Sequence, residues 1–487
     1  MSEKSLAQPL RAATTHGALL PLLRRLHFYI GLFIAPFIFV AALTGTLYVL
    51  TPQLEEALYA HQLFTDNTAE ARPLADQVRV AQNFAGKDLQ ISAVRPAPVA
   101  GETTRVMFTT PSSAPSESTA VFIDPVTLEI RGMLPVYGTS GVLPLRTWLD
   151  YLHRNLLLGD VGRNYSELAA SWLWIAALGG VLLWATSRPP RRAKGRGQQI
   201  LRQRFWHSSL GVALLIGLLF FSATGLTWSR WAGDNISAMR THFGWMTPAV
   251  NTSLLPDHPS QADEHAEHHM GAEDHGFAMS GMKMPDMQMP EHGHSPAPAL
   301  SITPAQFDGV VAAARAAGIT AGKIEIRPTA KAAKAWTVSE IDRRWPTQVD
   351  SVAVDPASFR VIDKVEFAQF GLLAKLTRWG VDAHMGVLFG LPNQLILAAF
   401  GLGLCMMIVL GYRLWWLRRP APAQGCHPAE TLIYNWRRLS LSARFLLLVC
   451  TVALAVSLPV MGVSLVALLL IDALRWLRAK KTSGLRH

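Results

Sequence analysis

Residues 24–49 read RRLHFYIGLFIAPFIFVAALTGTLYV, and residues 203–228 read QRFWHSSLGVALLIGLLFFSATGLTW. Each stretch is long and apolar enough to cross a hydrocarbon core of roughly 30 Å, which takes about 20 residues of helix. The second stretch repeats the first at one constant offset, so the chain contains a duplication of a predicted membrane span. The matched positions are His27 and His207, Gly31 and Gly211, and Thr44-Gly45 and Thr224-Gly225.

A second set of matches, at a larger constant offset, relates the regions around two further apolar segments. Each half therefore reads as span, exported domain, span, and the halves are predicted to be parallel repeats about a pseudo-two-fold axis along the membrane normal. The matched positions are Asp124-Pro125 and Asp355-Pro356, Trp148 and Trp379, His153 and His384, Gly159 and Gly390, and Trp184 and Trp415.

Composition and charge agree with a membrane protein. Half of the residues are hydrophobic, and the mean hydropathy is +0.21. The net charge is +11, and the positive residues gather beside the predicted spans, above all in 188–204. By the positive-inside rule, both termini are expected in the cytoplasm. Because the basic residues mark this orientation, no nucleic-acid partner is expected. None of the three cysteines, Cys405, Cys426 and Cys450, lies in an exported segment, so no disulfide framework is expected there.

The predicted fold class is a polytopic α-helical membrane protein with two exported α+β modules, built from two parallel repeats and a C-terminal helical hairpin. Helices are expected over 74–84 and 303–317, and the Asp-Pro pairs are expected in turns between strands. The predicted segments are 1–23 (cytoplasmic), 24–52 (span 1), 53–143 (module 1), 144–166 (interfacial helix), 167–187 (span 2), 188–204 (cytoplasmic loop), 205–230 (span 3), 231–370 (module 2, with an insertion at 257–294), 371–392 (interfacial helix), 393–417 (span 4), 418–442 (cytoplasmic loop), 443–477 (hairpin) and 478–487 (cytoplasmic tail).

The doubled order of span, small domain with an Asp-Pro turn near its end, and span resembles the PepSY-associated transmembrane helix family. The resemblance covers nearly the whole chain except the insertion and rests on the repeated order of short motifs. It implies PepSY-like exported modules and a multi-pass protein of the bacterial inner membrane. The better understood members of the family act in iron uptake and include ferric-siderophore reductases that bind two b-type haems.

Four histidines stand at the predicted membrane boundaries. His27 and His207 lie at the cytoplasmic ends of spans 1 and 3, whereas His153 and His384 precede spans 2 and 4 on the exported side. A pseudo-two-fold axis places the members of each pair opposite one another, as bis-histidine ligation of a haem iron requires. Together with the resemblance, this pattern predicts two haem b groups, while the alternative is that the histidines cap symmetric helix ends.

Arginines near these histidines are candidate partners of haem propionates, because a guanidinium matches a carboxylate. The alternative is that the inner arginines only set the topology. The Thr-Gly pairs are interpreted as small-residue packing sites without a chemical role. The candidate propionate partners are Arg24 and Arg204 near the inner pair and Arg154 near the outer pair.

Two haems at different depths would carry electrons from the cytoplasmic side to the exported side. The resemblance implies a transmembrane metalloreductase whose acceptor is a ferric siderophore, from which Fe(II) is released. The cytoplasmic loops are too short for a flavin or nicotinamide domain, so the electron donor is expected to be a quinol, a separate reductase or a cytosolic reductant. The expected partners are therefore membrane lipid, the ferric siderophore and this electron donor. No residue is assigned a catalytic role.

The insertion 257–294 is rich in histidine and methionine, and it is expected to be a loop that binds copper or another metal, because thioethers suit Cu(I) and imidazoles suit several metals. A low-complexity linker without metal is the alternative. Two other functions stay open: a reductase that handles exported copper, and a non-enzymatic PepSY anchor or regulatory module. A metal permease is disfavoured because the spans lack a run of acidic residues. The candidate ligands are His258, His265, His268, His269, His275, Met279, Met282, Met284, Met287, Met289, His292 and His294.

Overall fold

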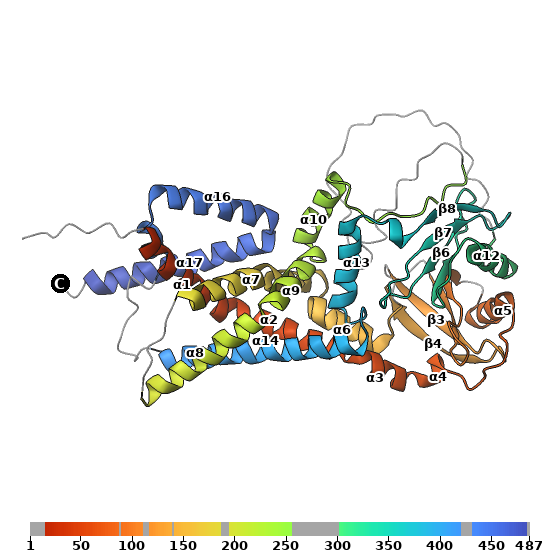
Figure 1. Cartoon of the computed structure of the whole chain (residues 1–487), viewed down its shortest axis with the longest axis horizontal. Coiled ribbons are helices and arrows are strands. Elements are labelled where there is room, and N and C mark those ends of the chain that lie inside the picture. The colour runs from red at the N-terminus through yellow and green to blue at the C-terminus, as the bar shows by residue number, and fades with distance from the viewer. Residues whose placement is uncertain are drawn as a thin grey trace, which may run out of the picture. The chain divides into compact units, whose positions relative to one another are not determined.

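The computed structural model describes residues 15–86, 89–110, 116–138, 141–186, 194–255, 301–419 and 431–484 (Figure 1). Its contacts divide the chain into two compact units. The helical unit comprises Met1–Thr46, His153–Ser237 and Ala399–His487. The sheet unit comprises Leu47–Leu152 and Ala238–Ala398.

The helical unit is made wholly or partly from eleven of the described helices, and its core is formed by buried apolar side chains such as Trp172, Leu218 and Leu404. The helices are α1 (Thr15–Tyr29), the π-helix η1 (Ile30–Ile34), α2 (Ala35–Val49), α7 (Gly159–Thr186), α8 (Arg196–Ala213), α9 (Leu215–Thr227), α10 (Trp231–His242), α14 (Leu391–Arg418), α15 (Leu432–Arg437), α16 (Leu441–Ser457) and α17 (Pro459–Gly484).

Four of the described helical segments are long and apolar enough to cross a membrane, and a bent pair of helices is a fifth candidate. At a rise of about 1.5 Å per residue, segments of this length exceed the thickness of the hydrocarbon core. The chain is therefore a multi-pass membrane protein. The candidate spans are Leu19–Val49, Gly159–Thr186, Leu391–Arg418 and Pro459–Lys481, with Arg196–Ala213 and Leu215–Thr227 as the bent pair.

The third predicted span, 205–230, is not one straight helix, because α8 and α9 meet at an angle of 59°. The break falls at Leu214, between Gly211 and Gly217. The ring of Phe400 lies only 2.2 Å from the point where a Cβ atom on Gly217 would stand, so only glycine fits there. Glycine lowers helix stability and permits this close approach, which explains why the bend falls here.

The sheet unit contains the α+β elements expected of the exported modules. The predicted helices 74–84 and 303–317 correspond to α5 and α12. The elements are α3 (Thr51–Leu58), α4 (Ala60–Leu63), α5 (Leu74–Ala85), β1 (Gln90–Arg95), β2 (Thr104–Thr109), β3 (Glu117–Ile123), β4 (Ile130–Tyr137), α6 (Pro144–Asn155), α12 (Ala305–Ala316), β5 (Ile324–Arg327), β6 (Trp336–Glu340), β7 (Ser351–Val354), β8 (Val361–Val365), the 3-10 helix η2 (Phe367–Gln369) and α13 (Leu372–His384).

The eight strands of the described residues form one antiparallel sheet, in the order β4-β3-β2-β1-β5-β6-β7-β8. Each half of the chain supplies four consecutive strands, and the halves meet where β1 pairs with β5 at Val94 and Ile326. Beside this pair, Arg95 Nε donates a hydrogen bond of 2.6 Å to Glu325 Oε2, and both side chains are buried. The two expected modules are therefore parts of one sheet, which the sequence did not indicate.

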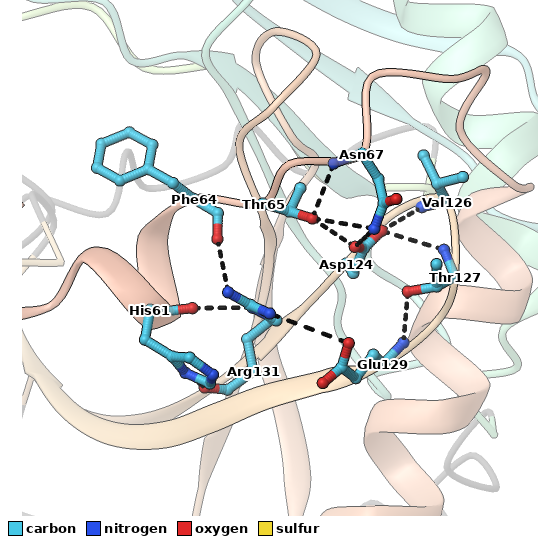
Figure 2. Close-up of polar contacts among 9 residues, drawn as sticks. All are labelled: His61, Phe64, Thr65, Asn67, Asp124, Val126, Thr127, Glu129 and Arg131. Carbon is cyan, nitrogen blue, oxygen red and sulfur yellow. Dashed lines mark hydrogen bonds and ion pairs between the residues drawn. The ribbon is translucent and has the colours of Figure 1, made fainter.

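The two Asp-Pro pairs lie in turns between antiparallel strands, as predicted. In the first turn, the buried carboxylate of Asp124 accepts hydrogen bonds from the side chains of Thr65 and Asn67 and from two backbone N–H groups of the turn, those of Val126 and Thr127 (Figure 2). Burial alone would raise the pKa of Asp124, but these hydrogen bonds lower it to about 2. Asp124 is thus a structural residue of this turn.

Candidate functional site

His27 and His207 lie together in the helical unit. Their ring centres are 6.4 Å apart, with an angle of 74° between the ring planes. His27 is in the last turn of α1 and His207 is in α8, so two helices far apart in sequence bring the imidazoles together. Of the four predicted haem ligands, these two form the pair whose geometry the structure describes.

Each of these imidazoles packs against a glycine of a neighbouring helix. The Cε1 atom of His27 is 3.1 Å from the position of a Cβ on Gly180, and that of His207 is 3.3 Å from the position of a Cβ on Gly411. Gly180 in α7 and Gly411 in α14 are related by the same offset as His153 and His384. A side chain at either glycine would push on the imidazole, so the glycines form seats for the two rings.

The ring nitrogens of the two histidines differ in their partners. Nδ1 of His207 is 2.9 Å from the carbonyl oxygen of Met407, so the ring donates through Nδ1 and leaves Nε2 with its lone pair. Nδ1 of His27 is buried without a hydrogen-bond partner among the described residues, although the carbonyl of Ala176 lies close enough to act weakly on the ring. Ala176 and Met407 are again repeat-equivalent positions, at the offset that relates Gly180 to Gly411.

Two imidazoles that bind one metal ion through ring nitrogens, at about 2.0–2.1 Å each, place their ring centres about 6 Å apart. The distance between His27 and His207 therefore fits two axial ligands of one iron. The buried Nδ1 of His27 is a polar atom left unsatisfied by the described residues, so this ring lacks the fixed orientation that the Met407 carbonyl gives to His207. The separation of the two rings is compatible with bis-histidine ligation of one iron ion.

Arginines gather at the same end of the helical unit. Arg24 and Arg204 both act electrostatically on Arg418, the last residue of α14. Arg24 is exposed and Arg204 is half-buried. This concentration of positive charge is compatible both with propionate binding and with the topological role of such residues.

His153, in the last turn of α6, is held by contacts with two segments of the helical unit. Its Nδ1 is 3.1 Å from the hydroxyl of Thr44, which itself donates to the carbonyl of Val40, so Nδ1 of the histidine is the donor in this contact. Its Cε1 lies 3.1 Å from the position of a Cβ on Gly45. Tyr165 donates to the backbone carbonyl of His153. The Thr44-Gly45 pair therefore orients a histidine, a role beyond the packing site inferred from the sequence.

Arg154 lies beside a group of charged residues at the start of α7. Its guanidinium acts electrostatically on that of Arg163, which is also influenced by Arg230. Arg230 forms an ion pair of 3.2 Å with Asp160. Arg154 is thus next to His153 in a strongly basic environment, as propionate binding would require.

His384 is the last residue of α13 and belongs to the sheet unit, whereas His153 belongs to the helical unit. The residues around it are fixed by a buried network in which the carboxylate of Asp382 binds Arg343 and Arg378. The side-chain amide of Asn393 donates to the carbonyl of Ala383. These contacts fix the end of α13, and the role of His384 as a ligand stays a prediction from the sequence.

The sequence profile of the PepSY-associated TM region matches residues 24–418. The chain belongs to this family. Among curated proteins, none matches the chain. The family assignment places a PepSY module in a membrane protein, and it agrees with the apolar helices and the antiparallel sheet of the structure.

The predicted metal ligands of this PepSY-family protein between His258 and His294 all lie outside the described residues. Within the described ranges, no group of three or more histidine, cysteine, aspartate or glutamate side chains could hold a metal ion. Metal binding by the insertion therefore stays a prediction.

Several residues of the site carry no strong signal in the sequence. Gly180, Gly411 and Gly45 are glycines in apolar helices, where glycine is common, and only the contacts reveal that they accommodate imidazoles. The relation between Gly180 and Gly411 could have been found by extending the match of His153 with His384 along spans 2 and 4. Met407 acts through its backbone, which leaves no trace in side-chain identity.

Proposed function

We propose that this protein is a di-haem transmembrane reductase that passes electrons outward to ferric siderophores in the exported compartment and so releases Fe(II) for uptake. The observation that carries the proposal is the pair of imidazoles of His27 and His207, whose ring centres are 6.4 Å apart. The family to which the chain belongs, and the matched positions of His153 and His384, support a second pair at another depth.

The protein's own residues would hold and orient two haem b groups. Haem, when bound, supplies a one-electron Fe(III)/Fe(II) couple. His27 and His207 would hold the inner haem, and the Met407 carbonyl fixes the tautomer of His207. Thr44 does the same for His153 at the outer haem.

The arginines predicted from the sequence fit this arrangement as partners of the propionates. Arg24 and Arg204 lie at the end that carries His27 and His207, and Arg154 lies beside His153. Their guanidinium groups would pair with the propionate carboxylates of a bound haem. A quinol or another reductant on the cytoplasmic side would supply the electrons. An inside-negative membrane potential would favour their transfer outward, by about 2.3 kcal/mol per 100 mV for a full crossing.

Visible spectra of the purified full-length protein test the proposal. The wild type should show a Soret band and two haems per chain, and His27→Ala and His384→Ala should each remove one haem. His61→Ala is the matched control, because His61 is an exposed histidine of α4 whose Nδ1 contacts a backbone carbonyl. A wild type without haem would reject the reductase and favour a non-enzymatic PepSY anchor or regulatory module. If one substitution removed both haems, the separate pairing would be wrong.

A copper reductase is the second candidate, favoured by the seven histidines and six methionines of 257–294. Deleting 257–294 and assaying the reduction of Fe(III)-siderophore and Cu(II) separately distinguishes the two. Unchanged iron reduction with lost copper binding would make the insertion an accessory of an iron reductase. If the wild type does not reduce the Fe(III)-siderophore and the deletion abolishes its reduction of Cu(II), the copper function would be supported instead.

A further inference from the structure

Arg25, in α1, has a buried guanidinium edge without a partner in the part of the chain that the structure describes. Its guanidinium carbon lies 4.9 Å from the centre of the Phe28 ring and 5.0 Å from that of Tyr29. Its Nε and Nη2 atoms are buried and make no hydrogen bond with the described residues. These two atoms form one edge of the guanidinium, the edge that binds a carboxylate or a phosphate with two parallel hydrogen bonds. A buried cation with this edge unsatisfied is unfavourable, so the site calls for an anion.

Asp472, an acidic residue near Arg25, already has hydrogen-bond partners within the protein. Asp472 in α17 is fully buried, and its two oxygens accept hydrogen bonds from the Tyr29 hydroxyl, at 2.5 Å, and from the backbone N–H of Ile433, at 3.0 Å. These bonds attach α17 to α1 and to the start of α15. Among the described residues, no acid therefore pairs with the Nε–Nη2 edge of Arg25.

Further cations surround the same place. Arg475 lies over the ring of Tyr29, at 5.8 Å, and Arg437 and Lys480 lie over the ring of Trp476, at 5.1 and 5.5 Å. We name these residues the basic–aromatic cluster, which consists of Arg25, Arg437, Arg438, Arg475 and Lys480 with Phe28, Tyr29, Tyr434 and Trp476. It gathers five positive charges from α1, the end of α15 and α17 around the carboxylate of Asp472.

The cluster stands at the ends of two candidate membrane spans. Arg25 lies near the start of Leu19–Val49, and Arg475 and Lys480 lie near the end of Pro459–Lys481. The face of α17 opposite the buried Asp472 carries leucines that are more than half exposed, namely Leu470, Leu474 and Leu477, as a lipid-facing surface would. An anion bound to the cluster is therefore at the level of lipid headgroups, and a phospholipid fits because its phosphate suits the cations while its acyl chains remain beside the apolar helices.

We propose that the basic–aromatic cluster is a binding site for one anionic phospholipid, whose phosphate pairs with the Nε–Nη2 edge of Arg25. The site is separate from the histidine pair. Arg25 and His27 are two residues apart, which places them about 200° apart around α1. His27 accordingly packs on α7, whereas Arg25 packs on the Tyr29 ring next to α17. The proposal does not depend on haem.

Native mass spectrometry of the full-length protein, exchanged into equimolar phosphatidylglycerol and phosphatidylcholine, tests the proposal. The wild type should retain one phosphatidylglycerol, and Arg25→Gln should lower its retention about tenfold, as expected for the loss of one charge-assisted pair. Arg25→Lys keeps the positive charge but lacks the two parallel donors of the guanidinium, so its retention of phosphatidylglycerol should lie between those of the wild type and Arg25→Gln. Arg413→Gln removes an exposed arginine of α14 outside the cluster and should retain phosphatidylglycerol as the wild type does.

Several results would overturn the lipid site. These are equal retention by Arg25→Gln and the wild type, equal retention of phosphatidylcholine, and an acidic protein that copurifies in place of lipid. Displacement by millimolar inorganic phosphate would mean that the cluster takes free phosphate. If Arg25→Gln fails to give a monodisperse protein, the double variant Arg437→Gln/Lys480→Gln serves instead, and unchanged retention by that variant equally rejects the site.

Discussion

The two helical segments that carry His27 and His207 accommodate their imidazoles in the same way but follow different paths. Each ring rests on a glycine, and those glycines, Gly180 and Gly411, occupy equivalent positions in the two repeats. Directly after His27 the chain passes through the π-helix η1, whereas after His207 it bends by 59°. The contact between imidazole and glycine is therefore the same in both repeats, whereas the paths of the helices around it differ.

The partners of Nδ1 differ as well. His207 donates to the Met407 carbonyl, but His27 has no hydrogen-bond partner for Nδ1 among the described residues. An imidazole whose Nδ1–H is hydrogen-bonded is a more basic ligand through Nε2. In the proposed haem site, the two axial ligands would therefore be unequal, with His207 the stronger.

The largest effect should come from filling the glycine seats. Gly180→Leu and Gly411→Leu should each remove the inner haem, about half of the total Soret absorbance, because the added side chain occupies the place of the imidazole. The measurement is the haem-to-protein ratio by the pyridine haemochrome spectrum. Gly31→Leu is the control, because a Cβ at Gly31 meets no atom within 4 Å. Full haem content in both variants would contradict the role of Gly180 and Gly411 in accommodating the imidazoles. Loss of haem in only one variant would mean that the two repeats do not accommodate their histidines equally.

The next largest effect concerns the place where the two halves of the sheet meet. Glu325→Ala removes the carboxylate that pairs with the buried guanidinium of Arg95, and breaking a buried ion pair in this way costs about 3–5 kcal/mol. Urea unfolding in detergent, followed by circular dichroism, should show this decrease in stability. Arg327→Ala removes the half-exposed partner of Glu325 and should cost no more than about 1 kcal/mol. Equal effects of the two substitutions would show that the β1–β5 junction does not depend on the buried pair.

The Asp-Pro turns of the two halves should differ in strength. Asp124 is fully buried and accepts two side-chain and two backbone hydrogen bonds, whereas Asp355 is half-buried and accepts from Ala357 N–H and the Ser358 hydroxyl. Asp124→Ala should therefore destabilise the sheet unit by about 1–3 kcal/mol and Asp355→Ala by less than about 1 kcal/mol. Thermal unfolding of both variants checks the order, and a larger effect at Asp355 would reverse this interpretation.

The same aspartate predicts how stability depends on pH. Burial opposes ionisation of Asp124, but its hydrogen bonds prevail and hold the pKa at about 2, below the usual value of about 3.9 in an unfolded chain. A lowered pKa stabilises the fold above the unfolded value, and this contribution is lost as the pH falls from about 3.9 towards 2. Unfolding series over this range should show a steeper loss in the wild type than in Asp124→Asn. Parallel curves would mean that Asp124 does not titrate as its contacts require.

The features that repeat along the chain could be predicted from the sequence, whereas the contact between the two halves of the sheet could not. The constant offset between spans 1 and 3 paired His27 with His207, and the structure brings their rings together, because a duplicated span keeps its face. The turns at Asp124 and Asp355 were predictable because Asp-Pro has a local preference. The β1–β5 junction was not, since Val94 and Ile326 pair through backbone groups that any edge strand offers.

The outer histidine offers the smallest and most specific comparison, between two threonines of α2. The Thr44 hydroxyl accepts from Nδ1 of His153, whereas the Thr46 hydroxyl donates to the backbone carbonyl of Ala42. Thr44→Val removes the acceptor with little change of shape, and loss of such a partner typically weakens binding at least about tenfold, so the outer haem should dissociate more readily. Haem transfer to apomyoglobin measures this rate, with Thr46→Val as the control. Since Gly45 still provides the seat for the imidazole, the outer haem should be weakened but still bound. Unchanged transfer in Thr44→Val would show that the seat alone positions His153, and complete loss would show that the hydroxyl does more than fix the tautomer.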